Sequence, residues 1–280
     1  MKETVKKNSN RLYFNYKSLD SFTGGLKKDD LVILGTDPIR KAVVVATNLI
    51  REVVKQDKQV LYVSLGKDKE ELLKGYPELL NPNILIDDES ASIIDVEKRA
   101  AAHQGFDLIM IDNSNKTWND TYLVKTKTYH RYKKMAENVR IPVLILTGVS
   151  SIIGTRSRPR HIKVIEYCNY MFFLYRPVLQ QYQEDYNHRT DDLFNEMEIR
   201  MFNFKTRTEI KAYAIYSKET YEIREISSRI RKLLRLARSL GLNAEDSIRY
   251  AFYWEDKELP EDRTDNIDKG EQDDDQRWTL

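Results

Sequence analysis

Short apolar segments alternate along the chain with longer segments of helical periodicity. Six apolar segments are rich in Val, Ile and Leu and lack a polar face, a pattern typical of strands buried on both sides in a parallel sheet. They comprise residues 31–35, 59–65, 83–86, 107–112, 142–148 and 170–176. Between them, residues 42–55, 93–103 and 121–139 have the pattern of helices. This alternation predicts an α/β fold built on a doubly wound, mostly parallel sheet.

A polar, irregular segment follows residue 176 and ends this alternation. After it, residues 197–204 and 211–216 alternate apolar and polar side chains. They predict a C-terminal β-hairpin whose two strands are joined by residues 205–210.

A helical pattern follows the hairpin. In residues 223–240, apolar side chains recur at three- and four-residue steps and predict a helix. Gly241 suits the C′ position of this helix, and Asn243 is a candidate N-cap for a second helix that ends near Trp254. The sequence therefore predicts a small helical extension after the sheet.

Charge is distributed unevenly, although the net charge is only +2. Residues 255–280 contain eleven acidic and four basic residues, a net charge of −7, so the rest of the chain carries +9. Asp, Glu, Asn, Gly and Gln dominate this tail, which is typical of disorder, and a basic body suits contact with a polyanion. The expected parts are an N-terminal arm (1–17), a core (18–220), a helical pair (221–254) and an acidic tail (255–280).

The composition also bears on the cellular compartment. No segment approaches the roughly 18 consecutive apolar residues that a membrane span needs, and the first ten residues lack the apolar run of a signal peptide. Cys168 is the single cysteine, which excludes an intramolecular disulfide and a multi-cysteine zinc site. We expect Cys168 to be a small buried residue at the start of a strand, and the protein to be cytoplasmic, without membrane contact.

A partial phosphate-binding loop follows the first predicted strand. A working P-loop reads G-x-x-x-x-G-K-[ST] between a strand and a helix. Gly35 and Lys41 have the required spacing, but Arg40 replaces the second glycine and Ala42 replaces the hydroxyl residue. A side chain at the glycine position crowds the phosphates, and alanine cannot ligate Mg²⁺. A helix N-terminus with two adjacent cations remains, and it still attracts anions.

With this loop, several ordered segments resemble the C-terminal, RecA-like domain of DnaB-type replicative helicases over residues 18–216. Residues 18–26 (SLDSFTGGL) resemble the segment that precedes the P-loop strand of that family. Residues 60–65 (VLYVSL), 108–112 (LIMID) and 141–146 (IPVLIL) resemble, in order, the strand that ends in the catalytic glutamate, the Walker B strand and the strand that leads to a polar sensor. The resemblance implies a RecA-like P-loop core, with ATP and Mg²⁺ as cofactors and DNA as a ligand.

The chain departs from this family at the positions that serve hydrolysis. Gly66 stands where the family has its catalytic glutamate, and Gly148 stands where it has a glutamine sensor. A general base typically contributes about 10² to 10⁴ in rate, and glycine supplies none of it. Asp112 remains at the position that holds the Mg²⁺ shell in the family, although with Ala42 opposite we expect weak metal affinity. No confident catalytic residue remains, and binding of ATP and Mg²⁺ is itself in doubt.

The resemblance also implies two basic sites. Lys205 and Arg207 form a K-x-R pair that, in the family, reaches the γ-phosphate of a neighbouring subunit. The alternative is an ordinary basic hairpin turn. A second group of cations falls where the family places its central-channel loops, and we expect it to contact DNA, most naturally single-stranded. This group comprises Arg156, Arg158, Arg160 and Lys163.

Three functions stay open at this point. The first is a non-hydrolysing, DNA- or helicase-binding accessory factor in DNA replication or maintenance, which pairs with DnaB-like helicase subunits or with further copies of itself. The second is an active ATP-dependent helicase in which Asp68, Glu70 or Glu71 replaces the missing glutamate. The third is a regulator that binds duplex DNA through the basic C-terminal helices.

Overall fold

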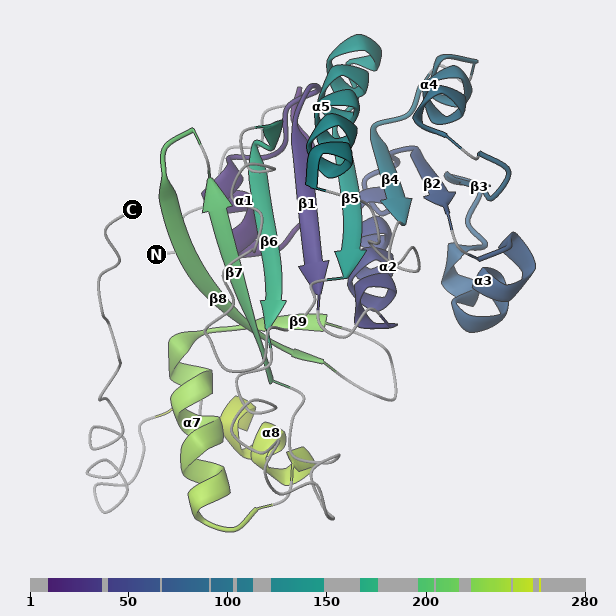
Figure 1. The fold of residues 1–280 in the computed structure, drawn as a ribbon. Coiled ribbons are helices and arrows are strands. Elements are labelled where there is room, and N and C mark those ends of the chain that lie inside the picture. Colours follow the sequence, from purple (N-terminus) through teal and green to yellow (C-terminus); the bar gives the residue numbers. More distant parts are fainter. Residues whose placement is uncertain are drawn as a thin grey trace.

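In the computed structural model, one nine-stranded sheet organises the described part of the chain (Figure 1). The described residues are 10–36, 40–65, 67–90, 92–102, 105–112, 122–148, 167–175, 196–203, 205–216, 223–242, 244–253 and 257. The strand order is β3-β2-β4-β5-β1-β6-β7-β8-β9. The strands are β1 (Leu31–Thr36), β2 (Val60–Ser64), β3 (Ile84–Asp87), β4 (Leu108–Asp112), β5 (Val143–Gly148), β6 (Tyr170–Tyr175), β7 (Glu196–Asn203), β8 (Thr208–Tyr216) and β9 (Ile223–Ile226).

The first six strands are parallel, as the sequence predicts. β1 lies between β5 and β6, and β4 lies between β2 and β5. Every residue of β2 and β4 is buried, which explains why these segments are apolar on both faces. The predicted α/β class and its mostly parallel sheet are therefore confirmed.

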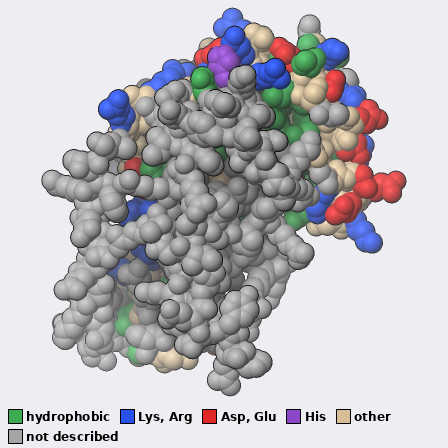
Figure 2. All heavy atoms as spheres, viewed as in Figure 1, with side chains coloured by type: hydrophobic (Ala, Val, Ile, Leu, Met, Phe, Trp, Pro, Cys, Tyr) green, Lys and Arg blue, Asp and Glu red, His purple; other side chains and the backbone are tan. Residues whose placement is uncertain are grey.

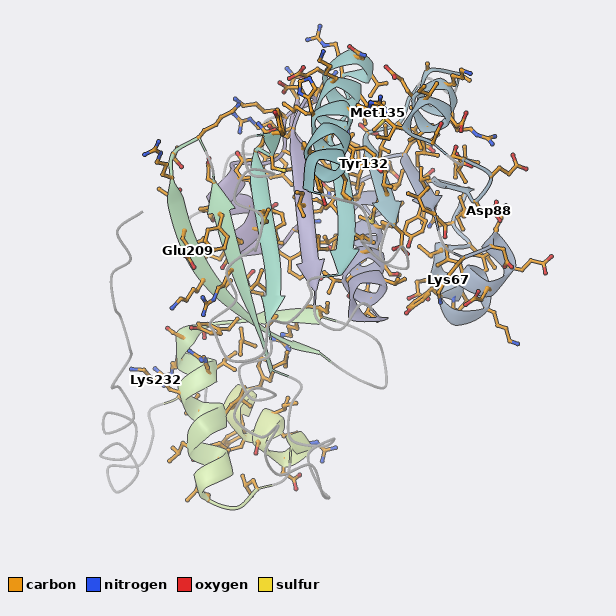
Figure 3. All side chains as sticks on the ribbon, viewed as in Figure 1. Lys67, Asp88, Tyr132, Met135, Glu209 and Lys232 are labelled. Carbon is orange, nitrogen blue, oxygen red and sulfur yellow. The ribbon has the colours of Figure 1, made fainter. Side chains whose placement is uncertain are left out.

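Helices cover both faces of the parallel strands (Figure 1). They are α1 (Lys17–Thr23), α2 (Arg40–Val54), α3 (Lys69–Gly75), the 3₁₀ helix η1 (Pro77–Leu79), α4 (Ile93–Ala102) and α5 (Tyr122–Val139). Side chains of α1, α2 and α3 pack in one core with Val32 and Leu34 of β1, whereas α4 and α5 pack in a second core with Leu31 and Ile33. Figure 3 shows Tyr132 and Met135 of α5 among the residues of this second core.

The segment that the sequence treats only as a family motif forms α1 and its turn. The Gly24 N–H donates to the Asp20 carbonyl, and both Gly24 and Gly25 have positive φ. A Cβ on Gly25 would lie 2.8 Å from the Tyr13 ring, so only glycine fits there. Ahead of α1, Leu12 pairs with Leu26 through backbone hydrogen bonds and is buried in the core of α1 and α2.

The C-terminal hairpin is predicted correctly, but its turn and the following helix are not. β8 begins at Thr208, so residues 208–210 belong to a strand and not to the connection. Residues 223–226 form strand β9 beside β8 and are not the start of a helix. Helix α7 (Ser228–Ser239) begins only after Ser227, whose Oγ accepts a hydrogen bond from the Ile230 N–H at 3.1 Å. This capping hydroxyl separates the strand from the helix.

The end of α7 follows the sequence prediction. Gly241 has φ +80°, and the Leu242 N–H donates to the Ala237 carbonyl at 3.2 Å, which is the Schellman arrangement for a glycine at C′. The second predicted helix is α8 (Ala244–Tyr253), whereas the candidate cap Asn243 lies outside the described residues. α7 and α8 pack with Ile215 of β8 and Ile226 of β9.

Cys168 is buried directly before β6, as predicted. Burial raises the pKa of its thiol far above the ordinary value, so the reactive thiolate is scarce. We expect iodoacetamide at mildly alkaline pH to leave the native protein unmodified and to alkylate it in concentrated guanidinium chloride, as measured by mass spectrometry. Equal rates in both conditions would contradict the burial of this thiol. No helix in the described part of the chain is both long and apolar enough to span a bilayer.

Candidate functional site

Several positions singled out in the sequence meet at one edge of the sheet, where β1, β2, β4 and β5 end (the carboxyl edge). Gly35 is the penultimate residue of β1, and Gly148, the last residue of β5, is paired with Thr36. β4 ends at Asp112 at the same edge. Glycine at position 148 contributes no side chain there. The parallel register explains this convergence, because strands that start together also end together.

Helix α2 begins at this edge. Its first turn contains the backbone of Arg40, Lys41 and Ala42, whose side chains lie outside the described part, as do residues 37–39. The aligned N–H groups of a helix N-terminus carry a partial positive charge that attracts anions. The arrangement of strand, short connection and helix is thus that of a phosphate-binding loop.

Asp112 is a buried carboxylate at this edge, and its side chain is held by the neighbouring strand. The Tyr62 hydroxyl donates to Asp112 Oδ2 at 3.0 Å, and the Leu65 N–H donates to the Asp112 carbonyl at 3.1 Å. Burial, and then the Asp112 charge, raise the pKa of Tyr62 well above its ordinary value. Tyr62 therefore stays protonated and remains a donor.

The carboxylates that could replace the missing glutamate are at the start of α3. Asp68 is the N-cap of this helix, with Oδ1 accepting from the Glu71 N–H at 2.7 Å. Glu71 also forms an ion pair with Lys67 at 3.1 Å, and Figure 3 shows Lys67 beside α3. Asp68 and Glu71 thus serve the local structure of α3. Gly66 itself lies outside the described residues.

The donor set at the carboxyl edge fits Mg²⁺ poorly. Mg²⁺ usually binds through one or two carboxylates, substrate phosphates and water. Here Ala42 supplies no oxygen, and an ion at Asp112 would compete with Tyr62 for the same carboxylate. Among the described residues, no group of three or more His, Cys, Asp and Glu side chains could hold a metal ion.

Lys205 and Arg207 are exposed in the β7–β8 turn, at the opposite end of the strands (the amino edge). Asn203, the last residue of β7, pairs with Tyr170, the first residue of β6, so this turn lies beyond the start of the parallel strands. The Asn203 side chain accepts hydrogen bonds from the backbone N–H groups of Lys205 and Thr206 at 3.0 and 3.2 Å and shapes the turn.

The electrostatics agree with this placement. Asp30, directly before β1, has a raised pKa because it is buried, and the Lys27 N–H and the nearby charges of Lys133 and Lys205 oppose that effect. Lys205 therefore lies near the start of β1 and not near its end. Figure 2 shows Lys and Arg side chains along the upper edge of the molecule, where Figure 1 places the amino edge and α5.

The predicted DNA contacts cannot be placed. Arg156, Arg158, Arg160 and Lys163 lie in residues 149–166, outside the described part of the chain.

Sequence reasoning missed Tyr62. A signal was present, because a tyrosine inside a fully buried aliphatic strand needs a hydrogen-bond partner for its hydroxyl. Tyr62 lies two residues before Ser64, which pairs with Asp112, so Tyr62 and Asp112 occupy the same face of neighbouring strands. This register becomes visible only once β2 and β4 are known to be adjacent.

Solved structures with the same fold are helicase ATPase domains. One of them, described as an ATPase domain, matches with a TM-score of 0.63 and 19% identity, over 79% of this chain and 93% of that one. A DnaB-like replicative helicase, described with its interactions with primase, matches with a TM-score of 0.61 and 18% identity, over 77% of this chain and 62% of that one. This chain thus spans less than two thirds of the second protein.

No protein-family model and no curated protein matches the sequence. The architecture alone makes the connection, through its mostly parallel sheet with helices on both faces. The chain has the RecA-like fold of the ATPase domain of DnaB-like replicative helicases.

Proposed function

We propose that this chain is a DnaB-helicase-like protein with a decayed ATP site, which acts in the cytoplasm as a non-hydrolysing, DNA- or helicase-binding accessory factor in DNA replication or maintenance. The observation that carries the proposal is the commitment of Asp68 and Glu71 to the first turn of α3. With glycine at positions 66 and 148, no replacement base and no sensor side chain stand at the positions that serve hydrolysis in the family.

The test is a single-turnover assay with Mg·ATP and single-stranded DNA. We expect no hydrolysis above background, because a missing general base alone lowers the rate by about 10² to 10⁴. Turnover near about one per second, the low end of ordinary enzyme rates, would reject the proposal and favour the active-helicase alternative. Calorimetric titration of ATP, with and without Mg²⁺, separately measures whether the pocket still binds a nucleotide.

Single-stranded DNA is the ligand that we propose for the basic segment at residues 154–163. Replacing its four cations with alanine should lower affinity by about 10²-fold near physiological salt and flatten the plot of log K against log salt by roughly 3, since each single-strand phosphate contact contributes about 0.7. The four substituted residues are Arg156, Arg158, Arg160 and Lys163.

A matched control removes the same charge from exposed lysines elsewhere. Filter binding over a salt series should show this control with nearly the wild-type slope, and equal slopes for the two quadruple variants would refute the assignment. The control residues, all exposed, are Lys55, Lys69, Lys74 and Lys98.

Two observations disfavour the duplex-DNA alternative. Cations of the proposed DNA-binding helices are used within the protein, since the Arg231 guanidinium lies 3.6 Å from the centroid of the Tyr213 ring and the Arg224 guanidinium 3.9 Å from that of Phe252. The second helix, α8, also presents an exposed acid, Asp246, where a recognition helix would need donors for phosphates and base edges.

Deleting residues from Ile223 onward is therefore a poor test of that alternative. The truncation would strip β9 from β8 and uncover Ile215. Single substitutions of exposed cations, such as Arg229→Ala, keep the sheet intact, and we expect them to leave duplex binding unchanged.

A further inference from the structure

Tyr62 places a hydroxyl group inside an otherwise aliphatic strand. Its side chain is fully buried, between strands that are themselves fully buried. A phenol hydroxyl in such a place costs free energy unless it is hydrogen-bonded. Its partner is Asp112 Oδ2, at 3.0 Å.

The same contact also solves a problem for Asp112. This side chain belongs to a residue that is only 3% exposed, and a buried carboxylate is costly unless a cation or donors compensate it. A hydrogen bond to a charged group is stronger than one between neutral groups. In a site that holds Mg²⁺, the cation and its water shell supply this compensation. Here the compensation that the structure describes comes from the adjacent strand.

We propose that the Tyr62 hydroxyl takes the place of a metal shell at Asp112, so that the carboxylate stays buried at the carboxyl edge without a divalent cation. This inference rests on the proposed function, because it explains how the fold tolerates a decayed metal site. Tyr62 is a positioning residue, since it acts on a ligand site only through Asp112.

A double-mutant cycle tests the pairing. Tyr62→Phe removes only the hydroxyl, and we expect it to lower the melting temperature by roughly 3 to 10 °C, because it leaves a buried carboxylate without this donor. In an Asp112→Leu background the same substitution should change the melting temperature by about 2 °C or less, since both polar groups are then absent. Should Asp112→Leu not fold, Asp112→Ala serves as the second background.

The matched control is Tyr132→Phe, another buried tyrosine, which packs in the core of α5 and far from this carboxylate along the chain. We expect a shift of about 2 °C or less. Equal losses from Tyr62→Phe in the wild-type and Asp112→Leu backgrounds would overturn the inference. The cycle is run without nucleotide, so its outcome is independent of the turnover assay that tests the proposed function.

Manganese gives a second readout that a merely structural hydrogen bond would not move. We expect millimolar Mn²⁺ to shift the melting temperatures of the wild-type protein and of Asp112→Leu equally, which means that no ion binds at Asp112. A Mn²⁺-dependent rise in the wild type that disappears in Asp112→Leu would show that the carboxylate is available to a metal. That result would overturn the inference.

Discussion

A chain that carries Lys205→Ala and Arg207→Ala should fail to restore hydrolysis to a DnaB-like helicase that lacks its own K-x-R pair, whereas the unmodified chain should restore it. In phosphoryl-transfer enzymes, a basic residue supplied in trans raises kcat by about 10³ to 10⁵. We therefore expect the two substitutions to lower the rescued rate by about 10³ or more. This prediction rests on the proposed pairing with helicase subunits.

Geometry decides why the effect must occur in trans. The turn that holds Lys205 and Arg207 follows Asn203, which pairs with the first residue of β6. The phosphate-binding loop follows the last residue of β1, at the opposite end of a six-residue strand that spans roughly 20 Å. A phosphate that this turn contacts must therefore belong to another molecule.

The measurement is steady-state ATP hydrolysis by the finger-deficient helicase, titrated with each form of this chain. Lys211→Ala is the matched control, because Lys211 is an exposed cation on the same hairpin but in strand β8. We expect this control to rescue as well as the unmodified chain. Equal rescue by the double alanine variant would mean that the turn is only a basic hairpin turn.

Local pattern accounts for most of the sheet. Residues 107–112 and 142–148 are apolar on both faces, and only strands buried between two helical layers require that composition. The convergence of Gly35, Asp112 and Gly148 follows as well, since the ends of parallel strands share an edge.

Features that depend on distant partners were missed. Ile223–Ile226 continues the periodicity of α7, and only its pairing with β8 makes it a strand. Helix α3 carries a readable signal, the Asp68 cap with Glu71 three residues later, but it is a single short turn pattern between two strands. The contact of Tyr62 with Asp112 needs the order of β2 and β4, which no local window contains.

Strand β9 offers the second large effect, because one buried side chain ties it to the phosphate-loop helix. Asn48 of α2 accepts a hydrogen bond from the Ile223 N–H at 3.1 Å and one from the Arg51 guanidinium at 2.8 Å. On the other side of Ile223, its carbonyl accepts from the Tyr16 hydroxyl at 3.2 Å. The backbone N–H of Ser18 donates to the Glu225 carboxylate. The start of β9 is thus anchored to α2 and to the residues around α1.

Asn48→Leu is expected to lower the free energy of unfolding by about 2 to 4 kcal/mol. The substitution leaves the buried N–H of Ile223 without its acceptor, and an unsatisfied buried group costs about 1 to 3 kcal/mol, to which the lost contact with Arg51 adds. Urea unfolding measures the total. Asn138→Leu, at an exposed asparagine of α5, is the matched control and should change stability by about 0.5 kcal/mol or less.

Hydrogen exchange locates the effect. In Asn48→Leu, we expect the amides of Ile223–Ile226 and of α7 to lose protection before those of β1 and β4, because the broken contact holds only the C-terminal strand. Uniform loss across the sheet would mean that Asn48 stabilises α2 itself and not its junction with β9. Under the expected outcome, the helix that follows the phosphate-binding loop directly anchors the C-terminal helical pair, because β9 leads into α7 and lies beside β8 in the same sheet.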